Sequence, residues 1–141
     1  MSRTFVMVKP DGVERGLVGE IVGRIERKRL CIRAMKMLRI DAKTAEQHYA
    51  EHRDKPFFRD LVSFITRGPV VAMVVEGPEA VETVRALMGA TDPRRALPGT
   101  IRGDFGIEIT ENLVHGSDGE EAAERELALY FDAEELVGET R

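Results

Sequence analysis

One histidine, His115, stands where its side chain could act as a nucleophile. Val114 before it is typical of a strand, and Gly116-Ser117 after it begin a turn into a helix. The N-terminus of that helix would offer free N–H groups and a positive dipole end, both of which attract a phosphate. A neutral imidazole has a lone pair that can accept a phosphoryl group near pH 7. A phosphoryl carrier is therefore one interpretation of His115, and a purely structural histidine is the other.

Charged residues elsewhere in the chain could assist such a histidine. Glu126 borders the apolar stripe of the last helix, where it is either an ordinary surface acid or a carboxylate that orients an imidazole; periodicity does not separate the two. Lys9, Arg85 and Arg102 would each, taken alone, be a solvated surface charge. Placed together around His115, they could clamp a triphosphate and stabilise a metaphosphate-like transition state.

Several common kinds of site are excluded by spacing. The sequence has no Gly-x-x-x-x-Gly-Lys-Ser/Thr motif, and the glycines from Gly12 to Gly23 do not form a dinucleotide-binding fingerprint. His48 and His52 are four residues apart but have no evident third ligand, so we expect no protein-held metal site. A P-loop fold, a Rossmann cofactor and structural zinc are therefore disfavoured.

Composition limits the class of protein and its partners. The 141 residues are 43% hydrophobic and 33% charged, which suits one domain over residues 1–141. The net charge of −4 disfavours nucleic acid as a partner, and no apolar run or leader-like segment indicates a membrane protein or an exported one. The single cysteine, Cys31, fits a reducing cytoplasm and is expected to pack inside. Having only one asparagine, Asn112, and one glutamine, Gln47, hints at heat resistance.

Hydrophobic periodicity predicts alternating strands and helices packed as an α/β or α+β sandwich. Strands are expected over Thr4–Lys9, Ile32–Ile40, Val70–Val75 and Leu113–His115. Helices are expected from Val18 to about Leu30, over Lys43–Glu51 with Asp41 as N-cap, over Phe57–Ile65, from Pro78 to a stop at Gly89, and after a capping box at Ser117–Glu120. Ala90–Asp104 is expected to be a long and therefore functional loop.

The segment Asn112-Leu113-Val114-His115-Gly116-Ser117-Asp118 resembles the active-site signature of the nucleoside diphosphate kinase family, Asn-x-x-His-Gly-Ser-Asp. Further resemblance follows in order along nearly the whole chain. It is carried by Val8–Gly12, His48-Tyr49, Lys55–Phe58, Gly68–Val70, Gly89–Pro93 and Pro98–Asp104. The chain is thus similar to that family across almost its full length.

The resemblance implies a fold and a reaction. The fold would be an α+β, ferredoxin-like βαββαβ sandwich with a four-stranded antiparallel sheet and a helix pair inserted between its second and third strands. The reaction would be ping-pong transfer: ATP or another nucleoside triphosphate phosphorylates His115, and a second nucleoside diphosphate then takes the phosphoryl group. Mg²⁺ would bridge the nucleotide phosphates without a dedicated protein cage.

The resemblance also implies a role for each matching residue. Glu126 and Ser117 would orient His115, while Lys9 and Asn112 would reach the sugar hydroxyls. Phosphate contacts would come from Lys9, Tyr49, Arg85, Thr91 and Arg102. Phe57 would stack on the base, with Leu61 and Ile109 lining the slot, and stacking alone tolerates every base.

The family's oligomers lead us to expect a homo-oligomer, most simply a hexamer, with a tetramer or dimer as alternatives. The Ala90–Gly103 loop would join subunits, and Arg94 and Arg95 add like charges there that could oppose a symmetric contact. Arg29 stands where a glycine usually ends the first helix, and Arg67 replaces a small residue. Two other functions stay open: a ferredoxin-like binding protein that has lost catalysis, and a protein that phosphorylates histidines of other proteins.

Overall fold

The computed structural model describes residues 1–137. Its strands and helices follow one another as β1 (Ser2–Val8), α1 (Pro10–Glu14), α2 (Val18–Arg27), β2 (Cys31–Leu38), α3 (Ala42–His48), α4 (Phe58–Ile65), β3 (Val70–Gly77), α5 (Ala80–Met88), α6 (Ile101–Phe105), β4 (Val114–Gly116) and α7 (Glu120–Tyr130). Two 3-10 turns, η1 (Ala50–His52) and η2 (Ala133–Glu135), follow α3 and α7.

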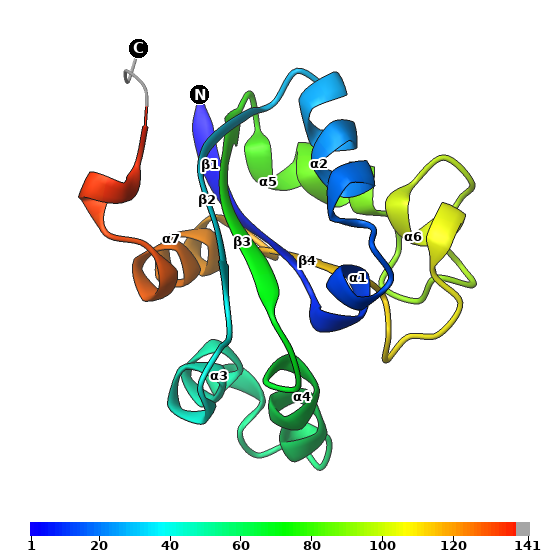
Figure 1. The fold of residues 1–141 in the computed structure, drawn as a ribbon, viewed down its shortest axis with the longest axis vertical. Coiled ribbons are helices and arrows are strands. Elements are labelled where there is room, and N and C mark those ends of the chain that lie inside the picture. The colour runs from blue at the N-terminus through cyan, green and yellow to red at the C-terminus, as the bar shows by residue number, and fades with distance from the viewer. Residues whose placement is uncertain (138–141) are drawn as a thin grey trace.

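The four strands form one antiparallel sheet in the order β2-β3-β1-β4. The helix α2 connects β1 to β2, and α5 lies between β3 and β4, which is the ferredoxin-like βαββαβ order (Figure 1). The pair α3 and α4 is inserted between β2 and β3. The predicted fold class is therefore confirmed.

Helices cover both faces of the sheet, with α2 and α5 on one side and α3, α4 and α7 on the other (Figure 1). Successive side chains of a strand point to opposite faces, so β1 sends Val6 and Val8 into the first core and Phe5 and Met7 into the second. Every residue of β3 is buried. This explains why its sequence is apolar without alternation, as expected for a strand covered on both faces.

Most expected boundaries agree with the structure, but the expectations for Pro78 and for the Ala90–Asp104 loop are wrong. Pro78 is not in the first turn of a helix, because α5 begins at Ala80 and its N-cap, Glu79, has a left-handed φ of 45°. The segment expected to be a continuous loop to Asp104 contains α6. Thr100 starts this short helix by accepting a hydrogen bond from the N–H of Gly103, so a local capping signal outweighed the surrounding glycines and prolines.

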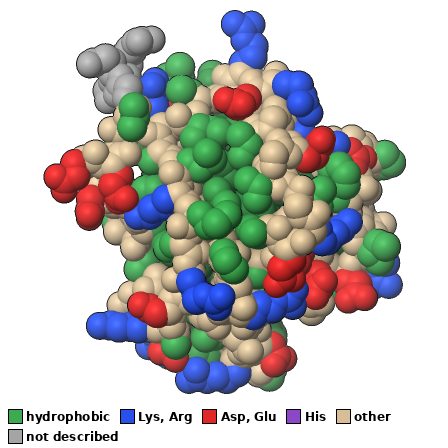
Figure 2. Space-filling view, in the orientation of Figure 1, with side chains coloured by type: hydrophobic (Ala, Val, Ile, Leu, Met, Phe, Trp, Pro, Cys, Tyr) green, Lys and Arg blue, Asp and Glu red, His purple; other side chains and the backbone are tan. Residues whose placement is uncertain are grey.

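The expectation that Cys31 packs inside is also wrong, because its side chain is exposed on β2. This strand forms one edge of the sheet, so a neighbour covers only one of its sides. Met35 and Met37, also on β2, are 53% and 61% exposed. Figure 2 looks onto this edge and shows hydrophobic side chains gathered across the middle of the face. The edge strand is therefore an apolar surface of the isolated chain.

Ion pairs join neighbouring turns of a helix as well as segments that are distant in sequence. Arg67 binds Glu14 and Glu111 through separate guanidinium nitrogens, and Arg24 binds Glu20 and Asp104. Arg29 has a φ of 69°, in agreement with its place at a position that favours glycine. Within residues 1–137, the structure has no helix long and apolar enough to cross a membrane.

Candidate active site

A cavity of about 760 Å³ opens beside β4, and residues from distant parts of the sequence line it. It gathers nearly the whole set of site residues expected from the sequence. Those lining it are Lys9, Tyr49, Phe57, Leu61, Arg85, Thr91, Arg102, Ile109, Asn112, His115 and Glu126. Ser117 is the exception, since it is 1% exposed and lies behind the cavity wall.

His115 is the middle residue of β4 and lies opposite Met7 of β1. Because strand side chains alternate, Val114 enters the core beneath α5, whereas His115 points to the face covered by α3 and α7. On the α5 side, a Cβ added at Gly116 would come within 2.6 Å of the end of the Met88 side chain, so a larger residue there would have to displace that side chain. The short strand therefore holds the imidazole in one place and leaves it half-buried at the cavity.

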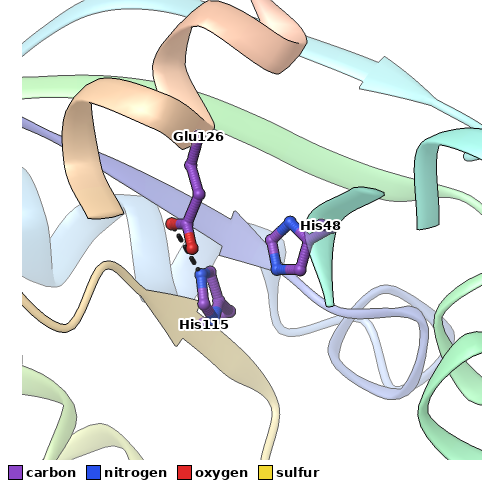
Figure 3. A group of neighbouring side chains, drawn as sticks. All are labelled: His48, His115 and Glu126. Atoms are coloured by element: carbon purple, nitrogen blue, oxygen red, sulfur yellow. Dashed lines mark hydrogen bonds and ion pairs between the residues drawn. The ribbon is translucent and has the colours of Figure 1, made fainter. Parts of the chain in front are cut away.

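The carboxylate of Glu126 lies between the His115 ring and the Ser117 hydroxyl. Its Oε1 atom lies 2.9 Å from Nε2 of His115 (Figure 3) and accepts a hydrogen bond of 2.7 Å from the Ser117 hydroxyl. Burial opposes the charged form of Glu126, yet the hydrogen bonds and charges of its neighbours outweigh burial and hold its pKa below the usual range. An ionised carboxylate only accepts hydrogen bonds, so the proton of His115 is on Nε2 and the lone pair is on Nδ1.

The expected capping box at Ser117–Glu120 is wrong. The N-cap of α7 is Gly119, which has no side chain to accept a hydrogen bond, and the Ser117 hydroxyl turns inward to Glu126 instead. Glu120 and Glu121 occupy the first turn of α7, where their negative charges oppose the attraction of that helix end for a phosphate. The structure therefore favours side-chain cations over the helix N-terminus as the source of positive charge.

Two of the three expected cations are buried and held by hydrogen bonds around His115. Arg102 donates hydrogen bonds to the carbonyl oxygens of Gly89, Asn112 and Val114, at 3.0, 3.2 and 2.7 Å. Burial first, and then the charge of Arg85, lowers the pKa of Arg102 to about 10. A guanidinium with this many backbone partners is fixed in position, unlike the solvated surface charge that its sequence context allowed.

Lys9 follows β1 and is 8% exposed. Its Nζ donates a hydrogen bond of 2.8 Å to Oδ1 of Asn112 and lies 5.1 Å from the ring centre of Phe64. Burial lowers its pKa to about 8, although the negative charge of Asp11 opposes the shift. The third cation, Arg85, is different, because it is exposed and pairs with Asp118 at 3.0 Å.

Asp11 is a supporting residue that sequence reasoning missed. Leu113 has a φ of 76°, which costs free energy in a branched residue, and the buried Asp11 carboxylate accepts its N–H at 3.0 Å. The Leu113 carbonyl in turn accepts the Lys9 N–H at 2.9 Å. These bonds hold Asn112, whose Nδ2 donates to the Thr91 carbonyl at 2.9 Å. The Pro-Asp-Gly turn was visible in the sequence, but its partner was not.

The far end of the cavity is more open and apolar. Phe57 and Ile109 are 44% and 52% exposed, and Leu61 lies half-buried next to them in the lining. A ring and two aliphatic side chains offer flat apolar contact with no fixed hydrogen-bond pattern. This end of the cavity can therefore accept an aromatic group by stacking.

His48 is a second residue of the site to which sequence reasoning assigned no role. It is 4% exposed, and its ring centre lies 4.7 Å from that of His115 in an edge-to-face arrangement (Figure 3). Nδ1 bonds the Tyr130 hydroxyl at 3.0 Å, whereas Nε2 is buried without a hydrogen-bond partner. Burial first, and then His115, lowers its pKa to about 3, so it is neutral at pH 7. The spacing of His48 and His52 suggested no third ligand, yet the fold places His48 beside His115 and Glu126.

Comparison with known proteins places this geometry in context. Residues 2–136 match the family described as nucleoside diphosphate kinase. The chain is 64% identical over 137 residues to the nucleoside diphosphate kinase of Archaeoglobus fulgidus, covering 97% of this chain and 91% of that protein. It has the same identity to the enzyme of Thermus thermophilus, with 97% of this chain and 100% of that protein covered.

Solved structures agree with these sequence matches. A halophilic nucleoside diphosphate kinase from Halobacterium salinarum, in complex with CDP, is 61% identical and superposes with a TM-score of 0.95 over 99% of this chain and 93% of that one. A nucleoside diphosphate kinase family protein from Babesia bovis is 52% identical, with a TM-score of 0.96 over 100% of this chain and 95% of that one.

Proposed function

The chain belongs to the nucleoside diphosphate kinase family, and from that premise we propose that His115 carries the phosphoryl group in its reaction. The enzyme is a phosphotransferase that moves the γ-phosphoryl group of a nucleoside triphosphate to a nucleoside diphosphate through a phosphohistidine. The contact between Nε2 of His115 and Glu126 carries the proposal, because it leaves the Nδ1 lone pair free to attack.

In the first half-reaction, Nδ1 of His115 forms a bond to the γ-phosphorus of ATP or another triphosphate. The bond from that phosphorus to the bridging oxygen breaks, so that a diphosphate leaves. The ring gains positive charge as it is phosphorylated, and the ionised Glu126 at Nε2 stabilises that charge. A terminal oxygen of a second diphosphate attacks the same phosphorus in the reverse step, and Nδ1 recovers its electron pair.

The surrounding cations would stabilise the transition state. We assign phosphate contacts to Lys9, Tyr49, Arg85, Thr91 and Arg102, all of which line the cavity. Charge spreads over the phosphoryl oxygens in a loose transition state, so donors that are already fixed lower the barrier most. The burial of Lys9 and Arg102 supports this role for these two residues in particular.

The other end of the nucleotide would lie along the open part of the cavity. We assign stacking on the base to Phe57, contact with its edges to Leu61 and Ile109, and the sugar hydroxyls to Lys9 and Asn112. The exposure of Phe57 supports a platform that distinguishes poorly among bases.

The family's reaction uses a divalent cation, and we propose that Mg²⁺ fills this role here. Mg²⁺ prefers oxygen ligands in an octahedron. Among residues 1–137, the one cluster of three possible metal ligands contains two imidazoles and does not fit it. The nucleotide phosphates would therefore hold the ion, which supplies charge neutralisation when bound.

We also propose a homo-oligomer, with a hexamer as the first expectation and a tetramer or dimer as alternatives. The exposed Met35 and Met37 of β2 support association with a second copy. Arg94 and Arg95 are exposed, but Asp92 lies 3.7 and 3.8 Å from them and offsets part of their charge. A single species of monomer mass in sedimentation velocity would contradict this assembly.

We also propose a cytoplasmic location, since the lone Cys31 thiol needs no oxidising compartment.

A labelling experiment tests the proposed role of His115. The protein is incubated with Mg²⁺ and γ-labelled ATP, freed of nucleotide, and examined for acid-labile, alkali-stable label; GDP is then added. We expect label on the wild type that leaves as GTP, and a loss of transfer of about 10⁴-fold or more in His115→Ala. His52→Gln, which changes another histidine of the cavity, should still take up label. Undiminished transfer in His115→Ala would disprove the assignment.

A further inference from the structure

His48 has a feature that phosphoryl transfer does not use. Its Nε2 atom is buried without a hydrogen-bond partner, although nearly all buried polar groups in proteins are paired. The ring is held by the Tyr130 hydroxyl at Nδ1 and lies against the ring of His115. An unpartnered imidazole nitrogen next to a second imidazole and a carboxylate is an arrangement that can ligate a metal ion.

The three side chains come from three different elements, α3, β4 and α7, and converge (Figure 3). One ligand atom from each of His48, His115 and Glu126 lies within 4.8 Å of the other two. Ligands about 2.0–2.2 Å from a tetrahedral ion are about 3.4 Å apart. Nε2 of His115 and Oε1 of Glu126 are 2.9 Å apart, and separations of up to 4.8 Å within the set would have to shrink by at most about 1.4 Å to reach the tetrahedral spacing. We propose that His48, His115 and Glu126 form a zinc-type site whose occupation inhibits the enzyme.

The ligand chemistry selects the kind of ion. Two imidazoles and one carboxylate suit Zn²⁺ and similar transition metals, and three protein ligands leave a fourth position open to the cavity. Mg²⁺ is excluded by its preference for six oxygens. The Tyr130 oxygen can accept a hydrogen bond from Nδ1 of His48, so the second ring nitrogen would be held by an outer partner, as it is in most metal-bound histidines.

Inhibition follows from the position of one proton. A neutral imidazole that binds a metal through Nε2 carries its hydrogen on Nδ1, so the proton now on Nε2 of His115 moves to Nδ1 within the same ring. The Nδ1 lone pair is then lost, and Glu126 is occupied by the metal. This consequence rests on the proposed role of His115, whereas metal binding itself does not.

Calorimetry with Zn²⁺ alone tests the site. The titration uses the whole protein without nucleotide, because phosphates chelate zinc, and with Mg²⁺ in large excess. All variants carry Cys31→Ser, which removes an exposed thiol that could bind zinc. We expect one zinc per chain, a loss of affinity of about 100-fold in His48→Phe, and unchanged affinity in the matched control His52→Gln.

Two results would overturn the site. One is equal zinc affinity with and without His48, in a variant whose circular dichroism is that of the wild type. The other is displacement of zinc by Mg²⁺. If His48→Phe does not fold, Tyr130→Phe replaces it, since it keeps the ring and removes only the outer hydrogen bond. Affinity should then fall by about 10–100-fold, and no change would count against the site.

The labelling reaction tests the consequence separately. Zinc bound to the protein before labelled ATP is added, and kept in molar excess over that ATP so that the nucleotide cannot remove it, should abolish uptake of label by His115, and a chelator should restore it. Full labelling of the zinc-bound protein would overturn inhibition while leaving the site in place. Failure of the zinc-free wild type to take up label would instead contradict the proposed function, so the two failures are distinguishable.

Discussion

The two ends of the cavity are built differently. At the inner end, Arg102 and Glu126 are 7% and 4% exposed, and each makes several hydrogen bonds. At the outer end, Phe57 and Ile109 are about half exposed and offer apolar surface. The difference fits the roles proposed for the two ends, because bond making requires fixed donors, whereas binding any of several bases requires only a flat surface.

This comparison predicts where substitutions act. Changes at the inner end should lower the rate of phosphoryl transfer, since they remove interactions that strengthen in the transition state. Changes at the outer end should weaken nucleotide binding with little effect on the chemical step. Measurements on variants of Glu126, Lys9 and Phe57, given in order of decreasing effect, test this division between the two ends.

Glu126→Ala should lower kcat by about 100-fold while the protein stays folded, because the imidazole loses the group that sets its proton position. Stopped-flow measurement of phosphorylation by ATP checks the rate. Glu124→Ala, an exposed acid on the same helix, is the matched control and should behave as wild type. An unchanged rate in Glu126→Ala would contradict the proposed orienting role of Glu126. It would also contradict the idea that contacts at the inner end set the rate of transfer.

The pH dependence of Lys9 offers a sharper test. Its pKa of about 8, lowered by burial, means that the free enzyme loses this charge as pH rises above 8. We expect kcat/KM to fall by about tenfold per pH unit there, because fewer molecules can bind the phosphates. Lys9→Arg, which stays charged, should lack this descending limb.

Stability should change in the opposite direction over the same range. In the unfolded chain the Lys9 amine has its ordinary pKa of 10.5 and stays protonated up to that pH, whereas the folded chain releases the proton from about pH 8. The unfolded state therefore binds more protons between these values, and the contribution of Lys9 to the free energy of unfolding rises with pH. Denaturant titrations of wild type and Lys9→Met across this range should show the difference, and parallel curves would contradict the shifted pKa.

Phe57→Ala should have the smallest effect. Loss of one stacking surface that is partly solvated costs about 1 kcal/mol, or about fivefold in KM, with kcat nearly unchanged. Steady-state kinetics with several diphosphates would measure it, and Phe57→Tyr should retain the wild-type value. A drop in kcat larger than the rise in KM would show that the outer end also takes part in catalysis.

Local sequence predicted those features that depend on neighbours along the chain. Asp41 caps α3 by accepting the N–H of Thr44, and Gly89 ends α5 with a φ of 89°. The buried strand β3 was visible as the uninterrupted apolar run Val70–Val75, and the strand continues for two further residues to Gly77. Cys31 was misjudged because residence on a strand does not say whether that strand is at the centre of the sheet or at its edge.

By itself, the sequence determined the chemical types at the site and their resemblance to a family, down to His115 and its signature segment. Three contacts became visible only in the tertiary structure: the buried Glu126 carboxylate lies beside Nε2 of His115, the Asp11 carboxylate accepts the N–H of the strained Leu113, and the His48 ring lies against that of His115. The physical reason is that these contacts join elements through sheet register and helix packing. Spacing along the chain constrains neither, because each depends on which faces are buried against each other.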